Sequence, residues 1–430
     1  MARVIVAGGG LAGCASAVRL AKLGHTVTLI ERLPVLGGDL RPVERDGFVW
    51  DSGVSATTLP AALRDLFKKS GRPLARELDL VQLPALREHR FADGSRVVLP
   101  AQSRVALRAA IDDGLDAGPS TGLGTGLGQR FADWVDGFAE AWELVRSELL
   151  EHAYAPAHTS KRLTALLRDR RTLHRSLEAL KDERLKAIGA HPFVAGGHDP
   201  RQIPWWLGFV HHVEQVFGAW TVSDGMGALA TLLEKRLGER RVRVVTETPV
   251  LDIETQAGAV TGVRTAAGVE AADVVVCAVD PRTLPALAPL VARTRPASAP
   301  SRTYLGLSGD TPTLAHETVL HGDASLTITT GRSPDGQAAW TVSAHGLASD
   351  VLDALADHGL DVRDQVVCRI DRPGPAHGVL WQGRSTPSRQ LLGRTPIAGL
   401  FTAGASATIH ASLPFTALTS SVVCELVGPA

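Results

Sequence analysis

The chain has 430 residues, and its 45 Lys and Arg balance its 45 Asp and Glu, so that its formal net charge at pH 7 is zero. This length predicts two or three domains with a sizeable core, which excludes a lone small module and a disordered chain. A neutral chain has no overall field that would gather nucleic acid, and we therefore expect no nucleic-acid partner.

The four cysteines, Cys14, Cys277, Cys368 and Cys424, lie far apart along the chain. Because no pair has the spacing of a zinc or iron–sulfur site, we expect reduced, buried thiols and no metal. The first thirty residues lack the pattern of a secretory leader, and no apolar run approaches the ~20 residues of a membrane span. We therefore expect a cytoplasmic protein with at most peripheral membrane contact.

The chain opens with the pattern of a strand, a helix and a second strand. Residues 3–7 form a β-branched run, residues 13–23 repeat small and apolar residues at helical spacing, and residues 25–31 are again β-branched. Gly24 is suited to end the helix. This order predicts a parallel sheet with a right-handed crossover.

The next region changes character. Residues 80–99 contain two extended stretches that meet at Asp93-Gly94, a dipeptide typical of tight hairpins, so a second, antiparallel sheet is expected. The pattern is then helical to about residue 189, except for the glycine-rich residues 114–128, which predict a surface loop. An amphipathic helix is expected over residues 160–189. It either packs on the core with a solvated face, or rests on anionic lipid and guides a lipophilic substrate inward.

The second half of the chain returns to strands. Short strands are expected at residues 241–245, 250–255, 259–265 and 273–278, then between residues 303 and 345, with a helix over residues 347–358. Residues 400–403 predict a last strand, and a Gly- and Ser-rich turn then leads into a helix that reaches the C-terminus.

Three glycines at the first strand–helix junction carry the clearest functional signal. Gly8, Gly10 and Gly13 have the spacing G-x-G-x-x-G. Gly8 makes the tight turn, Gly10 admits a pyrophosphate close to backbone N–H groups at the positive end of the helix, and Gly13 lets the helix pack on the strand. Glu31 ends the second strand 18 residues after Gly13, close to the ~20 residues at which an acidic side chain meets a ribose hydroxyl. Together they predict a dinucleotide site that disfavours NADP.

Four later stretches match motifs of a known family. Gly37-Gly38 follows the acidic strand, and residues 47–55 read GFVWDSGVS. Residues 220–229 (WTVSDGMGAL) and 399–421 (GLFTAGASATIHASLPFTALTSS) follow in order. With these motifs the chain resembles the FAD-dependent amine oxidase superfamily, and within it the bacterial phytoene desaturases. The resemblance runs from one end of the sequence to the other, although residues from about 101 to 197 share only their helical character with the family.

The resemblance implies FAD as the cofactor. It assigns cofactor contacts to Gly8, Gly10, Leu11, Ala12, Gly13, Glu31, Arg32, Gly37, Gly38, Arg41, Gly53, Val54, Ser55, Val250, Gly404, Ala405, Leu413, Pro414 and Thr416. Val250 falls where the family returns a strand to the adenine.

The sequence also departs from the family pattern. Asp39 stands where an arginine follows the glycine doublet, so a contact with the pyrophosphate would have to come from Arg41. Val54 replaces a proline, Asp224 replaces a glycine, and Ile409-His410 stand where a Pro-Gly would be. Changes of this kind beside a flavin alter chemistry or substrate more readily than fold.

The closing helix also has a physical interpretation of its own. Ser412 can cap it and Pro414 suits its first turn, so its free N–H groups would form an anion site that stabilises the charge of a reduced flavin. The alternative is a plain packing helix. His410, just before the helix, is the candidate catalytic residue, as a base or a ring contact, with a hydrogen-bonded spectator as the alternative.

Aromatic residues are the candidates for a substrate wall. Trp205, Trp206, Phe209 and Trp381 could line a pocket for an apolar molecule, although buried aromatics usually only pack. His211 and His212 are adjacent on an expected helix, so only one can face inward. His212 is the candidate for the substrate site.

These observations predict an α/β fold: a Rossmann-like FAD-binding domain of the glutathione-reductase type with an α+β substrate domain. We expect the FAD-binding domain at residues 1–75, 220–290 and 385–430, and the substrate domain at residues 76–219 and 291–384.

The resemblance implies an FAD-dependent oxidoreductase that oxidises or desaturates a small, largely apolar organic substrate, isoprenoid or secondary-metabolite-like, by hydride transfer to the flavin N5. The electron acceptor stays open, with oxygen and a quinone as candidates, and so does the oligomeric state. Alternatives are a flavin amine oxidase, a flavin-dependent isomerase and a prenyl-binding escort protein without redox catalysis.

Overall fold

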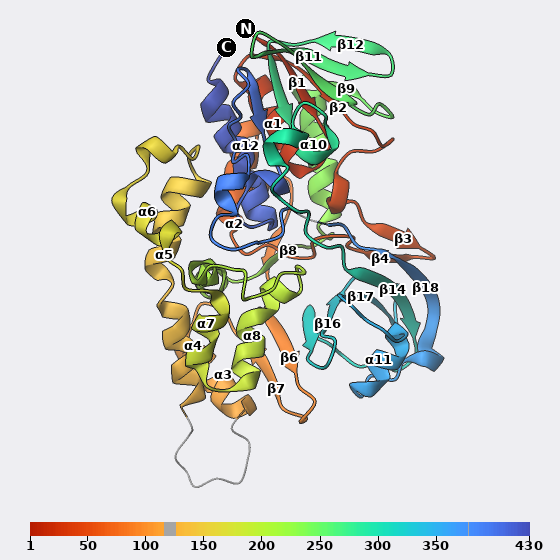
Figure 1. The fold of residues 1–430 in the computed structure, drawn as a ribbon. Coiled ribbons are helices and arrows are strands. Elements are labelled where there is room, and N and C mark those ends of the chain that lie inside the picture. Colours follow the sequence, from red (N-terminus) through yellow and green to blue (C-terminus); the bar gives the residue numbers. More distant parts are fainter. Residues whose placement is uncertain (116–125, 377) are drawn as a thin grey trace.

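The computed structural model describes residues 1–115, 126–376 and 378–430. Figure 1 shows three parts: a sheet flanked by helices near both termini, a group of helices, and a second, larger sheet. Most of the glycine-rich stretch predicted as a surface loop at residues 114–128 lies outside the described residues.

The sheet near the termini is parallel, with its strands in the order β19, β13, β1, β2, β9. These strands are β1 (Arg3–Ala7), β2 (Thr26–Ile30), β9 (Arg243–Val245), β13 (Val274–Cys277) and β19 (Leu400–Thr402). They come from three separated stretches of the chain. The predicted βαβ start and parallel sheet are confirmed.

Alternate residues of this sheet face two different layers, because side chains of a strand alternate in direction. Val4 and Val6 pack against helices on one face. Those helices are α1 (Leu11–Lys22), α2 (Pro60–Ser70), α10 (Gly227–Glu239) and α12 (Leu413–Val427). Ile5 and Val275 pack on the opposite face against a small antiparallel sheet. Its strands are β10 (Asp252–Gln256), β11 (Ala259–Thr265) and β12 (Gly268–Ala271).

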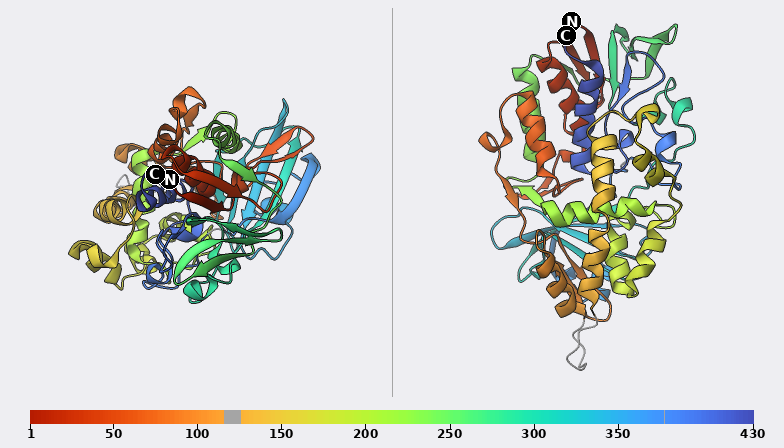
Figure 2. Two further views of the ribbon diagram at one scale, coloured as in Figure 1. Left: turned by 90° about the horizontal axis from the view of Figure 1, so that it is seen from above. Right: turned by 90° about the vertical axis from the view of Figure 1, so that its left-hand side faces the viewer.

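The two ends of the chain meet in this domain, as both views of Figure 2 show. Helix α12 packs against α1 and α2. The Ala430 N–H donates to the Leu23 carbonyl at 3.1 Å, and a ring nitrogen of His25 lies 2.9 Å from the Gly428 carbonyl. The C-terminal segment is thus part of the same core as the first strand.

The larger sheet has seven strands in the order β18, β14, β17, β16, β15, β6, β7, antiparallel except between β15 and β6. Their bounds are β6 (Arg87–Arg90), β7 (Arg96–Leu99), β14 (Ser301–Ser308), β15 (Glu317–Leu320), β16 (Leu326–Thr330), β17 (Gln337–Ala344) and β18 (Val366–Pro373). Leu326, Ile328 and Val342 pack on one face under α11 (Val351–Asp357). The predicted hairpin at Asp93-Gly94 is confirmed as β6–β7.

Two short strand pairs connect the layers. They are β3 (Val43–Arg45) with β4 (Phe48–Trp50), and β5 (Leu80–Gln82) with β8 (Trp220–Val222). The β3–β4 pair lies against the larger sheet, where Phe48 and Trp50 pack beside Tyr304 of β14. The polypeptide that leaves β4 therefore runs between the parallel sheet and the larger sheet.

The helical part contains α3 (Arg104–Leu115), α4 (Leu127–Asp136), α5 (Ala139–Val145), α6 (Lys161–Arg168), α7 (Leu173–Leu177), α8 (Glu183–Val194) and α9 (Phe209–Phe217). The single amphipathic helix expected over residues 160–189 is wrong, because that stretch forms α6, α7 and part of α8. Thr172 and Asp182 each cap a new helix with a side-chain oxygen, which interrupts the helical pattern.

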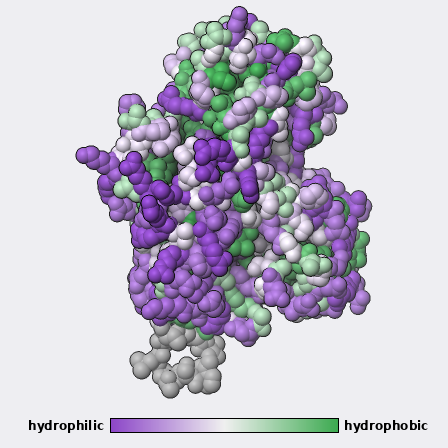
Figure 3. Space-filling view, viewed as in Figure 1, coloured by the Kyte–Doolittle hydropathy of each residue, from purple (hydrophilic) through white to green (hydrophobic). Residues whose placement is uncertain are grey.

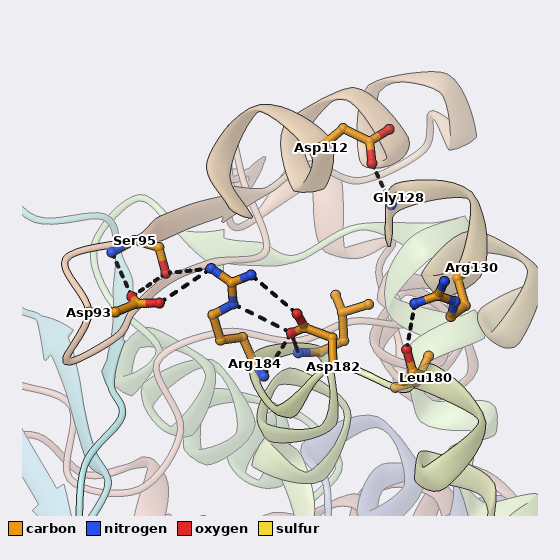
Figure 4. A network of polar contacts seen from close by, with 9 residues as sticks. Asp93, Ser95, Asp112, Gly128, Arg130, Leu180, Asp182 and Arg184 are labelled. Atoms are coloured by element: carbon orange, nitrogen blue, oxygen red, sulfur yellow. Dashed lines mark hydrogen bonds and ion pairs between the residues drawn. The ribbon is translucent and has the colours of Figure 1, made fainter. Parts of the chain in front are cut away.

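A polar network holds the β6–β7 hairpin against these helices (Figure 4). The Arg184 guanidinium lies 3.3 Å from a carboxylate oxygen of Asp93 at the hairpin and 3.2 Å from one of Asp182. The Asp182 carboxylate also accepts the backbone N–H groups of Arg184 and Leu185. One side chain thus joins the cap of α8 to the tip of the hairpin.

Two basic residues of the stretch that could form a lipid-bound helix are paired with carboxylates within the protein. Arg171 pairs with Asp169, and Lys186 pairs with Glu178 and Glu183. Hydrophilic residues dominate the helical part on the face shown in Figure 3. Among the described residues, none of the helices has the length and hydrophobicity that crossing a bilayer requires.

Candidate cofactor and substrate site

The glycine turn between β1 and α1 leaves open space at one position and none at another. A side-chain carbon added at Gly13 would lie 1.8 Å from the Gly8 carbonyl oxygen, so this position accepts only hydrogen. A carbon added at Gly10 would meet no protein atom within 4 Å. The turn therefore packs tightly behind the helix and is open in front of it, which is the shape that a pyrophosphate requires.

The Glu31 carboxylate is held at this turn. One of its oxygens accepts the Gly9 N–H at 2.6 Å, and the other accepts the Leu33 N–H at 2.9 Å. Because an ionised carboxylate offers about four acceptor positions, capacity remains for ribose hydroxyls. The side chain is buried, and its two backbone bonds fix its orientation.

A cavity of about 180 Å³ begins at this turn, and we name it the cofactor cavity. Several segments that are distant in the sequence meet around it. Its lining includes the predicted cofactor residues Gly10, Leu11, Ala12, Gly37, Gly38, Val54, Gly404, Ala405, Leu413 and Thr416. The apolar or backbone character of these residues and the open front of Gly10 fit an extended dinucleotide.

The other predicted cofactor residues lie around this cavity or away from it. Gly53, Ser55 and Pro414 line the adjoining space described below. Val250 packs with the core behind the parallel sheet, and Arg32 is exposed.

Arg41 is already engaged in the protein. Its guanidinium donates to the Leu36 carbonyl and pairs with Glu234 of α10. Arg41 can replace the arginine that the family has at the position of Asp39 only if its guanidinium leaves these partners.

A larger cavity of about 460 Å³, the main cavity, lies between the cofactor segments and the seven-stranded sheet. Val54, Ala411 and Leu413 line both the main and the cofactor cavity. A side cavity of about 170 Å³ shares Arg302 and His345 with the main cavity. The three cavities therefore adjoin one another beside the start of α12.

The start of α12 differs in detail from the expectation. Ser412 is the N-cap residue, as predicted, but its hydroxyl is buried and makes no hydrogen bond with any described residue. Pro414 does lie in the first turn. An unsatisfied buried hydroxyl at a helix start on the wall of the main cavity is suited to a ligand contact.

The predicted substrate-site residue Trp381 and the predicted catalytic residue His410 both line the side cavity. Trp206 packs edge-on behind Trp381, with ring centroids 5.9 Å apart, and Phe209 packs against Phe415. Trp205 stacks under Arg171 on the outer side of the helical part.

His212 lies apart from the other candidates. It is half-buried on the outer side of α9 and lines none of these three cavities. Its neighbour His211 turns inward, where a ring nitrogen lies 2.9 Å from the Gly189 carbonyl. The periodicity of the helix predicted that only one of the pair would face inward, and it could not say which.

His410 lies in an apolar setting. Its ring packs edge-on against Phe193 and Phe415, and its Nδ1 is buried without a hydrogen-bond partner among the described residues. Burial lowers the pKa of His410 to about 4. Its imidazole is therefore neutral at pH 7 and is a weak base.

A buried charged cluster next to the main cavity had no signal in the sequence. The Arg87 guanidinium donates to Glu214 at 2.6 and 3.0 Å and to Glu317 at 2.6 Å, and it therefore holds the pKa of each carboxyl group below its usual range. His191 lies 3.6 Å from Glu317. These residues come from β6, α9, β15 and α8, which only the tertiary fold brings together.

We expect thermal stability to fall when the pH is lowered from 7 to 5. Burial lowers the pKa of His198 and of His410 to about 4, and that of His321 to about 3. In the unfolded chain these histidines have pKa values near 6.5 and bind protons below that pH. In the folded chain they stay neutral at the same pH. The stability is present above pH 6.5 and is lost as the pH falls toward the folded pKa. Each such histidine costs on the order of 1–2 kcal/mol at pH 5.

Thermal unfolding midpoints measured from pH 5 to pH 8 at constant ionic strength check this expectation. The variant His410→Asn should show a shallower profile than the wild type, and the exposed His158→Asn should keep the wild-type slope. A flat profile for the wild-type protein would contradict the expectation.

Comparison with known proteins identifies the family of this chain. Residues 11–309 match the model of the family described as flavin containing amine oxidoreductase. The chain belongs to this family, and the predicted membership in the FAD-dependent amine oxidase superfamily is confirmed. Its class is therefore that of the FAD-dependent oxidoreductases, with FAD as the cofactor.

Curated relatives include carotenoid enzymes. A phytoene desaturase (neurosporene-forming) of Cereibacter sphaeroides is 30% identical over 274 residues, which cover 62% of this chain and 50% of the relative. A 4,4'-diapolycopene oxygenase of Methylomonas sp is 28% identical over 345 residues, which cover 75% of this chain and 66% of the relative. The matched region thus spans about half to two thirds of the length of these relatives.

Solved structures share the fold over nearly the whole chain. Cyclohexylamine oxidase from Brevibacterium oxydans matches with a TM-score of 0.68 at 15% identity, covering 99% of this chain and 100% of the other. The CLA-producing fatty acid isomerase from P. acnes matches with a TM-score of 0.65 at 16% identity, covering 99% and 98%. The predicted α/β, FAD-binding fold is confirmed.

Proposed function

We propose that this chain oxidises or desaturates a largely apolar organic substrate, isoprenoid or secondary-metabolite-like, in the main cavity. The observation that carries the proposal is the shared wall of the cofactor and main cavities at Val54, Ala411 and Leu413. Bound FAD supplies the acceptor for a hydride. The residues expected to hold the flavin thus border the space left for a substrate.

The relatives support the choice of substrate class. The phytoene desaturase and the diapolycopene oxygenase carry the names of isoprenoid substrates, and each matches more than half of this chain. We extend that class to this chain as a proposal. Oxygen or a quinone would reoxidise the protein, and peripheral contact with a membrane would deliver an apolar molecule.

The chain's own residues would bind, orient and exclude water. Glu31 and the glycine turn would hold the adenosine diphosphate end, and the start of α12 offers a positive dipole end to negative charge. His410, neutral at pH 7, would accept a hydrogen bond or a proton at Nδ1 in a dry pocket. The FAD-binding domain would comprise residues 1–75, 220–290 and 385–430.

The first test is the visible absorption of the purified protein. We expect the spectrum of oxidised flavin with about one FAD per chain, and bleaching when an isoprenoid substrate is added without oxygen. Mass spectrometry of the product should show the loss of two hydrogens. A colourless protein that takes up no added FAD would overturn the proposal in favour of a prenyl-binding escort protein.

Two other results would also overturn it. A product of unchanged mass would indicate a flavin-dependent isomerase. Peroxide release with a panel of amines, and none with isoprenoids, would indicate an amine oxidase.

A further inference from the structure

The floor of the main cavity is polar. Thr327 and Thr329 of β16 and Thr341 and Ser343 of β17 face this cavity, whereas the residues between them face the core under α11. The register places Thr327 opposite Ser343 and Thr329 opposite Thr341, so the four hydroxyls form a compact array on one face of the sheet.

These hydroxyls have no side-chain hydrogen-bond partner within the part of the chain that the structure describes. A wall built to hold only hydrocarbon would carry apolar side chains, because polar groups left without partners cost free energy when a ligand displaces their water. The array therefore indicates that oxygen or nitrogen atoms of a ligand complete these hydrogen bonds.

Arg302 extends the same array by one strand. It lies on β14 directly opposite Ser343, on the same face of the sheet, and lines both the main and the side cavity. Arg302 forms no ion pair with any described residue; its Nη2 is 3.5 Å from the Gly53 carbonyl, and its Nε is buried without a partner. Buried charges in proteins are normally paired, so this guanidinium has capacity for an anion.

Asp39, which lines the cofactor cavity, acts to raise the pKa of Arg302 through its charge but forms no ion pair with it. Glu317 binds Arg87, and Asp323 is exposed at the rim. Burial raises the pKa of Asp51, and the charges of His316 and Arg332 act on it in the opposite direction. Arg302 is therefore the cation of this wall that a substrate anion can meet.

We propose that the substrate carries an anionic oxygen group, a carboxylate or a phosphate, that binds Arg302, with further oxygens on the hydroxyl array. This proposal rests on the proposed function and refines its substrate class from a hydrocarbon to an acid with an apolar chain. Arg302 then determines both the preference for an anionic substrate and the position of the substrate's apolar chain beside the cofactor cavity.

The test uses the FAD-loaded protein and four isoprenoids with one carbon skeleton: farnesoate, farnesyl phosphate, farnesol and farnesene. Calorimetric titration without turnover should show farnesoate or farnesyl phosphate binding at least about tenfold more tightly than farnesol, with farnesene weakest. The tighter of the two anions identifies the head group. Equal or tighter binding of farnesene would overturn the proposal.

Variants assign the effect to the array. Arg302→Met should bring the anion and farnesol to within about threefold of each other, whereas Arg302→Lys should keep part of the preference. Thr341→Val should weaken farnesol and the anion alike. Arg372→Met is the matched control, because Arg372 lies opposite Arg302 on β18, packs on Tyr304 and lines none of these three cavities.

The bound FAD of each variant is measured from its absorbance before titration. Loss of FAD from Arg302→Met, together with the full wild-type preference in Arg302→Lys and wild-type affinities in Thr341→Val, would overturn the proposal and make Arg302 a cofactor contact. Selective binding of the anion without any oxidation would instead overturn the proposed function and would still support an anion site at Arg302.

Discussion

The substitution Gly13→Ala is expected to abolish retention of FAD. The added methyl group would lie 1.8 Å from the Gly8 carbonyl oxygen and 3.0 Å from the Gly8 carbonyl carbon, and both are backbone atoms that cannot rotate away. Helix α1 must therefore move from β1, which displaces the N–H groups of the turn. A strain of about 3 kcal/mol corresponds to FAD binding about 100-fold weaker.

The ratio of flavin absorbance to protein after gel filtration measures this effect, and circular dichroism reports whether the chain stays folded. Gly238→Ala is the matched control: this glycine is exposed in α10, and an added carbon would meet nothing within 4 Å. It should keep its FAD and gain slightly in helix stability. FAD binding by Gly13→Ala equal to that of the wild type would refute the assigned role of the turn.

The second large effect is expected at Arg87. Arg87→Met would leave Glu214 and Glu317 buried without the cation that both contact at 2.6 Å. Removing one partner of a buried ionic group costs about 3–5 kcal/mol, far more than the loss of an exposed pair. We therefore expect a strongly lowered thermal midpoint, and a free energy of unfolding reduced by about that amount.

Arg104→Met provides the comparison, because Arg104 pairs with Asp133 and Asp136 at the surface. Exposed pairs contribute about 0–1 kcal/mol. The triple variant Arg87→Met, Glu214→Gln, Glu317→Gln should recover much of the stability, since no buried charge is then left alone. Similar midpoints for Arg87→Met and Arg104→Met would show that the cluster is not held as described.

The cofactor half of the site could be predicted from the sequence because its signals are local. Gly8, Gly10 and Gly13 lie within one turn, and Glu31 follows at the end of the next strand, so short-range rules fix their relative positions. The residues around the cofactor cavity come from motifs that each specify a strand end or a helix start. Family resemblance then placed these motifs together.

The substrate half could not be predicted in the same way. Thr327 and Thr329 alternate with Leu326 and Ile328, which indicates a strand with a polar face but not what that face borders. Pairing with Ser343 and Arg302 depends on the register of three strands. Such register is set by the fold as a whole and leaves no trace in any one segment.

The helical part shows the limit of periodicity. Leucines recur at helical spacing over residues 160–189, yet the Thr172 and Asp182 side chains bind backbone N–H groups and start new helices. Capping competes with continuation of a helix at each such residue. The pattern therefore predicted the buried side of these helices better than their number.

The meeting of both chain ends in one core has a consequence for biosynthesis. β1 and the glycine turn are synthesised before β19 and α12, which pack beside them. The nascent chain can form the helical part and the seven-stranded sheet before its nucleotide pocket is complete. We therefore expect FAD to bind stably only after β19 and α12 have joined β1 and the glycine turn.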